Sequence, residues 1–94
     1  MLKYLEEHIL EELEGSVDYM TEAVAHKGKM CGEQFRKMSE AEAEHANILL
    51  HMFNHTERPK EVSEADYSSM LKKIMDKYAD AMTKVEKMKR VYWS

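Results

Sequence analysis

The stretch from Phe35 to Phe53 constrains the fold of this chain more than any other. If it is a helix, residues spaced three and four apart share one face. Most residues on that face are apolar, but Glu42 and His45, at its centre, are polar. A buried carboxylate normally needs a partner, because burying an unpaired charge is very costly. A neighbouring imidazole on the same face suggests that this partner is a metal ion. The whole row is Phe35, Met38, Glu42, His45, Leu49 and Met52.

Two further stretches have helical periodicity. Residues 2–27 carry two adjacent rows that together make a wide buried face, and one of these rows contains a carboxylate, Glu12. Residues 64–92 carry a single apolar row with no carboxylate and no histidine. The rows of the first stretch are Leu2, Leu5, Ile9, Glu12, Ser16, Tyr19, Ala23 and Leu10, Leu13, Val17, Met20, Val24. The row of the last stretch is Tyr67, Leu71, Ile74, Tyr78, Ala81, Val85, Met88 and Tyr92.

The breaks between these stretches predict the topology. Residues 28–32 begin and end with glycine, and Gly28 fits a helix C-terminal cap. Such a short connection favours antiparallel neighbours. Residues 56–63 contain the only proline, and Ser63 followed by Asp66 is a helix start signal. We therefore predict one all-α domain over residues 1–94, a long antiparallel hairpin (helices 2–27 and 33–54) plus a third helix (64–92). Gly15 is a mild weakness in the first helix, and close helix packing would be the structural reason for it.

Antiparallel packing can bring Glu12 to Glu42 and His45, because the three residues lie at similar distances from the turn. Two carboxylates and one imidazole suit iron, manganese or zinc. Known two-metal helix bundles use a glutamate from each of two helices and a Glu-x-x-His motif from each of the other two, so one chain here would supply half of such a set. A second chain around a twofold axis would supply the other half. Twofold dimers are the commonest oligomers. We therefore expect a homodimer or a larger homo-oligomer.

Two pieces of the sequence resemble the ferritin-like superfamily, especially rubrerythrin-type proteins and the short encapsulated ferritins. The first piece is Glu12-Leu13-Glu14-Gly15-Ser16-Val17-Asp18-Tyr19, in which an aromatic residue follows a glutamate by seven positions on the same face. The second is Glu42-Ala43-Glu44-His45-Ala46, which is similar to the Glu-x-x-His motif of that superfamily. The resemblance covers about residues 5–54.

The resemblance implies a ferritin-like half-bundle that is completed by dimerisation. It implies that Glu12, Glu42 and His45 bind iron, two ions per dimer site, with Tyr19 close to them and hydrogen-bonded to a ligand. It also implies ferroxidase activity, the oxidation of Fe(II) by dioxygen or peroxide. The chain departs from the superfamily in three respects. Glu86-x-x-Lys89 is a surface pair rather than a second ligand motif, rubredoxin-type cysteines are absent, and residues 90–94 do not resemble a tail that docks into an encapsulin shell.

Composition excludes several other classes of function. The net charge is −4, and no strongly basic patch indicates nucleic-acid binding. No segment approaches the ~18 apolar residues of a membrane span. Cys31 is the only cysteine, so no disulfide forms within the chain, and we expect a cytoplasmic protein. The alternative hypothesis is a non-enzymatic helical oligomerisation or interaction module. In that case the glutamate and histidine side chains would pair with each other or lie exposed on the helix.

Overall fold

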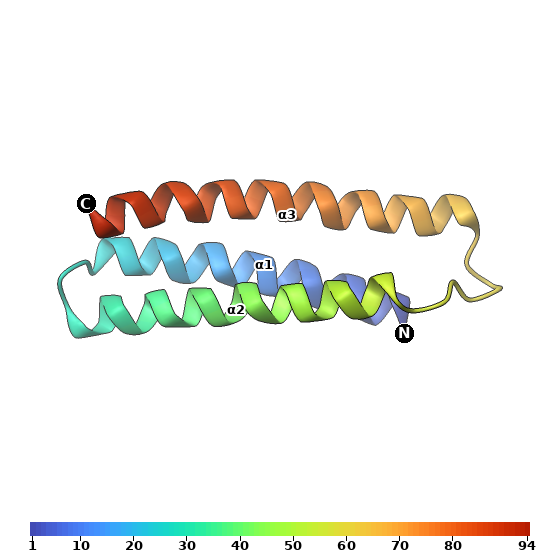
Figure 1. The fold of residues 1–94 in the computed structure, drawn as a ribbon, viewed down its shortest axis with the longest axis horizontal. Helices are drawn as coiled ribbons and strands as arrows, with labels where there is room; N and C mark the ends of the chain where they lie inside the picture. Colours follow the sequence, from blue (N-terminus) through green and yellow to red (C-terminus); the bar gives the residue numbers. More distant parts are fainter.

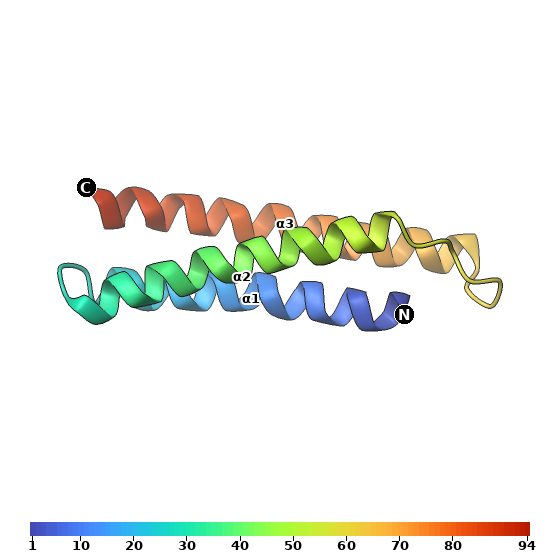
Figure 2. The same ribbon diagram turned by 60° about the horizontal axis from the view of Figure 1, so that its bottom comes forward.

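The fold is a bundle of three long helices. A computed structural model describes all 94 residues and contains α1 (Leu2–Ala25), α2 (Met30–Asn54) and α3 (Glu64–Trp93). The bundle measures 51 × 18 × 15 Å. α1 packs against both other helices (Figures 1 and 2). No Cα atom of α2 comes within 8 Å of one in α3. The predicted hairpin and third helix are confirmed. None of the three helices has an apolar stretch that meets the requirements for crossing a membrane.

The ends of the helices follow local sequence signals. Gly28 has a φ of 83°, the left-handed conformation that glycine adopts without steric cost, and it reverses the chain between α1 and α2. α2 begins at Met30, three residues earlier than predicted, so Gly32 belongs to the helix and not to the break. Gly32 is buried, and a Cβ atom there would collide with the backbone carbonyl of His26. α3 begins as predicted, with the Ser63 hydroxyl accepting a hydrogen bond from the Asp66 N–H at 3.0 Å.

The core lies between α1 and its two neighbours. Every residue of the row predicted for α3 is buried or half-buried, and Ile74, Ala81 and Val85 are fully buried. At one end of the bundle the Tyr67 ring stacks on Phe53, with ring centroids 5.5 Å apart. The larger of two core clusters consists of Leu2, Leu5, Ile9, Leu13, Ala46, Phe53, Ile74 and Ala81.

The buried face of α2 differs from the prediction. Its fully buried residues are Gly32, Ser39, Ala46 and Phe53, spaced seven apart. Met38 and Met52 from the predicted row are 41% and 44% exposed. Three of the four buried residues are small, so α1 can approach α2 closely along them. The predicted row is therefore turned toward the edge of the hairpin, where Phe35, Glu42 and Leu49 are half-buried.

A reciprocal pair of hydrogen bonds connects α1 and α2. The Ser16 hydroxyl donates to the Ser39 carbonyl at 3.0 Å, and the Ser39 hydroxyl donates to the Ser16 carbonyl at 2.6 Å. Both serines are fully buried. A one-residue slip between the helices would leave both hydroxyl groups buried without partners, which is unfavourable. This pair therefore fixes the register of the hairpin.

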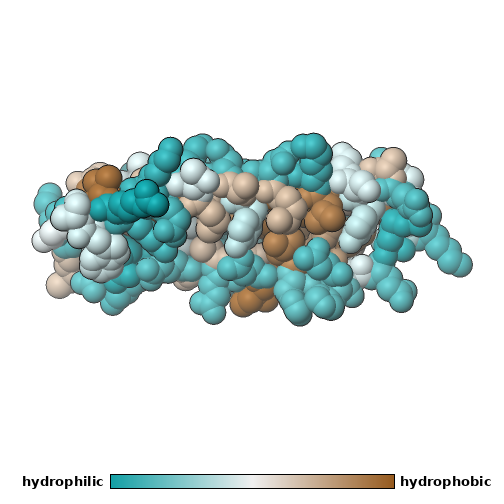
Figure 3. Space-filling view, turned by 45° about the horizontal axis from the view of Figure 1, so that its top comes forward, coloured by the Kyte–Doolittle hydropathy of each residue, from teal (hydrophilic) through white to brown (hydrophobic).

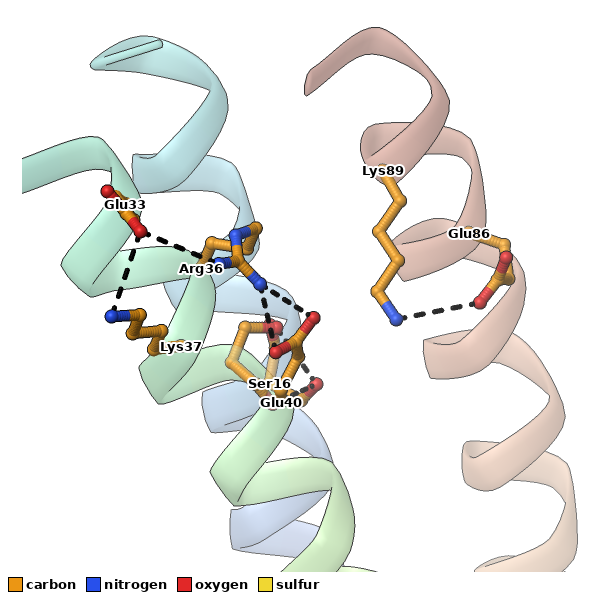
Figure 4. A network of polar contacts seen from close by, with 8 residues as sticks. Ser16, Glu33, Arg36, Lys37, Glu40, Glu86 and Lys89 are labelled. Atoms are coloured by element: carbon orange, nitrogen blue, oxygen red, sulfur yellow. Dashed lines mark hydrogen bonds and ion pairs between the residues drawn. The ribbon is translucent and has the colours of Figure 1, made fainter. Parts of the chain in front are cut away.

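Charged side chains cover the outside of the helices. In Figure 4, Arg36 of α2 bridges Glu33 and Glu40, and both carboxylate oxygens of Glu40 lie 3.0 Å from its Nη1. The same guanidinium lies 5.0 Å from the Trp93 ring centroid, which connects α2 to the end of α3. Figure 4 also shows Glu86 paired with Lys89 on α3, as predicted for a surface pair. On the face seen in Figure 3, apolar side chains gather in the middle of the bundle between hydrophilic ends.

Replacing either buried serine should destabilise the hairpin. We expect Ser16→Ala and Ser39→Ala each to lower the free energy of unfolding by about 1 kcal/mol, because each removes one buried hydrogen bond. The double variant should lose less than the sum, because the two hydroxyl groups are only 3.2 Å apart. Urea unfolding measures all three values, with Ser68→Ala on the exposed face of α3 as the control. Strictly additive losses would contradict the coupling.

Candidate metal centre

The three predicted ligands lie together at the edge of the α1–α2 hairpin. Glu12, Glu42 and His45 each offer one ligand atom within 4.8 Å of the others. The His45 Nδ1 atom lies 3.7 Å from Glu12 Oε2 and 4.0 Å from Glu42 Oε1. The register set by the buried serines produces this meeting, because Glu12 lies about one turn before Ser16 while Glu42 lies about one turn after Ser39.

The Glu12 and Glu42 carboxylates differ from those of Glu6 and Glu14 in lacking a permanent cation. Glu6, which is also buried, pairs with Lys3 at 3.7 Å and with Lys73 at 3.5 Å. Glu14 pairs with a lysine of α3. Glu12 and Glu42 have no lysine or arginine within ion-pair distance, and their shared partner is the imidazole of His45, which is charged only when protonated.

The two carboxyl groups strongly affect each other. A hydrogen bond with Glu12 raises the pKa of Glu42 to about 7, assisted by partial burial and by the negative charge of Glu12, while His45 acts in the opposite direction. Oε2 of Glu12 is buried and has no hydrogen-bond partner. The pair is therefore short of positive charge, which either a proton or a metal cation can supply.

The centre is open to solvent on one side. The side chains of Glu12 and Glu42 are 23% and 27% exposed, whereas His45 is 56% exposed and lies at the rim instead of facing inward as predicted. A hollow of about 250 Å³ adjoins the centre, and all its lining residues belong to α1 and α2. They are Tyr4, His8, Glu12, His45, Ile48 and Leu49. The three side chains of one copy therefore leave this side of the centre accessible.

Tyr19 lies on the same face of α1 as Glu12, seven residues later, but its side chain is not among those that meet at the centre. Its ring stacks on Phe35, with centroids 6.2 Å apart, and its hydroxyl makes no hydrogen bond to Glu12, Glu42 or His45. The Phe35 ring also faces His26 at 5.9 Å. The expected hydrogen bond from Tyr19 to a ligand is absent because this ring packs with the aromatic residues nearer the turn.

Two features of the centre were not predicted. Gly15 lies directly under the Glu42 carboxylate, so it does more than weaken the helix. His8 and Tyr4 line the hollow, and their rings lie 4.1 Å apart. The sequence does indicate that His8 lies near the centre, because residues four apart, such as His8 and Glu12, share a helix face.

Comparisons with protein-family models, with curated proteins and with solved structures give no match for this chain.

The raised pKa of Glu42 predicts how stability depends on pH in the metal-free protein. Below about pH 4.5 the carboxyl is protonated in both the folded and the unfolded state. As pH rises from 4.5 toward 7, the unfolded state loses this proton first, whereas the folded state still holds it. The free energy of unfolding therefore falls over this range. Glu42→Gln cannot ionise, so we expect it to be more stable than the wild type at pH 8 and little different at pH 4. Thermal unfolding across this range, in the presence of a chelator, measures the difference. A constant difference at all pH values would contradict the assignment.

Proposed function

We propose that this chain binds iron through Glu12, Glu42 and His45, and that it oxidises Fe(II) at a two-metal site shared between two copies of the chain. The observation that carries the proposal is a pair of adjacent carboxylates in which a buried Glu12 oxygen accepts no hydrogen bond and no lysine or arginine lies within ion-pair distance. Elsewhere in the bundle a lysine neutralises the buried glutamate. A cation at this centre would do the same.

The donor set fits iron, and manganese or zinc would also suit it. Two carboxylates supply oxygen and one imidazole supplies nitrogen, a combination typical of sites for these metals. The ligand atoms are already within 4.8 Å of one another, so small side-chain rotations would let all three converge on one ion. The resemblance to ferritin-like proteins at Glu12 and at the Glu42-x-x-His45 motif supports the same assignment.

Three ligands per chain favour a site that two chains complete. Three side chains cannot hold two metals in a closed cage, but two copies related by a twofold axis would supply six ligands. Exposed apolar side chains lie on this side of the hairpin, as a contact surface would require. Tyr4 and Ile48 line the hollow beside the centre, and Met38 and Met52 are exposed on the same row of α2 as Glu42 and His45. Glu42 would then bridge the metals, while Glu12 and His45 would each bind one.

The proposed reaction uses Fe(II) as its substrate. Two Fe(II) ions each give up one electron, and dioxygen accepts both electrons together with two protons to form hydrogen peroxide. The chain would hold the ions side by side in a fixed carboxylate cage. Glu42, whose pKa of about 7 leaves it partly protonated near neutral pH in the metal-free protein, would lose this proton when iron binds.

An anaerobic Fe(II) titration tests the proposal. We expect about one iron per chain in the wild type, two in a shared site, and no binding at this centre in Glu42→Ala or His45→Ala, because each removes a ligand. Glu86→Ala, which changes an exposed carboxylate on α3, is the matched control and should bind as the wild type does. Equal iron binding in all four proteins would refute the assignment of ligands. Oxygen consumption after adding air then measures the oxidation itself.

Ile48→Lys tests whether a second chain completes the site. Ile48 is 53% exposed, so a lysine there should leave the stability of the monomer unchanged. If a second copy covers this face, the new charge should weaken the dimer and abolish the two-metal stoichiometry. Analytical ultracentrifugation with and without Fe(II) measures the association. Met75→Lys, at an exposed position of α3, is the control. A dimer of Ile48→Lys as stable as that of the wild type would show that this face is not the contact.

The alternative is a helical interaction module without a metal. The closeness of the Glu12 and Glu42 carboxyl groups favours it, because a proton held between them would also relieve their repulsion. His45 would then act as the ionic partner of Glu12. In this case the exposed apolar residues of α2 would bind a protein, and the Fe(II) titration would detect no site.

A further inference from the structure

Gly15 lies in the middle of α1, where a glycine is unfavourable compared with alanine. The backbone does not require a glycine at this position, because Gly28 is the glycine with a positive φ. At Gly32 a side chain would collide with the backbone carbonyl of His26. No backbone atom is among the nearest contacts of a Cβ atom at residue 15. The reason for this glycine must therefore lie in the side chain that faces it.

That side chain is Glu42. A Cβ atom on residue 15 would lie 2.7 Å from Glu42 Oε2, 3.4 Å from its Cδ and 3.5 Å from its Cγ. No other residue of the chain is among these nearest contacts. The whole end of the Glu42 side chain therefore rests on the bare Cα of Gly15, on the side of α1 that also presents Glu12.

We propose that Gly15 is a positioning residue for the candidate metal centre, because its lack of a side chain lets the Glu42 carboxylate lie against α1 and reach Glu12. This inference rests on the proposed function and explains why α1 carries a glycine here. A methyl group would move Oε2 outward by about 0.7 Å, from 2.7 Å to the 3.4 Å of an ordinary contact. Metal ligands must be held within about 0.5 Å of their productive positions, so a shift of this size matters.

Gly15→Ala separates the positioning role from a structural one. We expect its melting temperature to rise by about 4–8 °C, since alanine favours the helix and the displaced group is the flexible end of a side chain. We expect its affinity for Fe(II) to fall by about 10- to 100-fold, as is typical when a group that orients a ligand is changed. Asp18→Ala, on an exposed position of the same helix, is the matched control for helix propensity and should bind Fe(II) as the wild type does.

A shorter carboxylate provides a rescue. Glu42→Asp should bind Fe(II) poorly when residue 15 is glycine, because its carboxylate stops short of Glu12. When residue 15 is alanine, the same change should cost less or improve binding, because the shorter side chain avoids the methyl group. The two effects would then be non-additive in a double-mutant cycle. Additive effects would overturn the inference.

A crystal structure of metal-free Gly15→Ala distinguishes failure of this inference from failure of the proposed function. If the wild type binds no iron, the proposed function fails, but a displaced Glu42 carboxylate in the variant would still support the positioning role. If the wild type binds iron and Gly15→Ala binds it equally well, with Glu42 in place, the inference alone is overturned. Loss of helical structure in Gly15→Ala would also overturn it, because the glycine would then be needed for folding.

Discussion

The register between α1 and α2 is the constraint on which the rest of the molecule depends. Two buried serine hydroxyls, each bonded to the other helix's backbone, hold the helices at one axial position. Small residues on α2 allow the close approach that these bonds need. All three candidate ligands lie within about a turn and a half of the serines, so an error in register would separate them. The packing of α1 on α2 and the meeting of the three candidate ligands thus depend on the same few contacts.

Charge is distributed so that one pair of carboxylates is left without a permanent partner. Lysines neutralise Glu6 and Glu14, but none approaches Glu12 or Glu42. In the absence of another cation, the free energy of this arrangement is lowered by a proton, which explains the raised pKa of Glu42. Natural chains often accept such local instability at functional sites, where a ligand restores what folding leaves unfavourable.

Helical periodicity and turn chemistry were sufficient to predict the three helices, the antiparallel hairpin and the meeting of Glu12, Glu42 and His45. They did not predict how α2 is rotated about its axis. Counting apolar residues placed Met38 and Met52 inside, whereas close packing favoured the small side chains of Ser39 and Ala46. The exposed position of His45 follows from the same rotation. Tyr19 was assigned by its spacing, but its ring found an aromatic partner that spacing alone does not show.

The arrangement of α3 has a consequence for how this chain can change. α3 packs along α1, its backbone stays away from α2, and the hollow beside the candidate ligands is lined only by the first two helices. Substitutions in α3 are therefore constrained mainly by its fit to α1. A few side-chain contacts with α2 add to this, such as the ring of Tyr67 on Phe53 and the Tyr78 hydroxyl donating to Asn47. The hairpin, whose parts are close in sequence, can assemble its polar centre through local contacts before α3 docks. The polar centre and the docking surface of α3 thus rest on largely separate sets of contacts, so a change in one need not disturb the other.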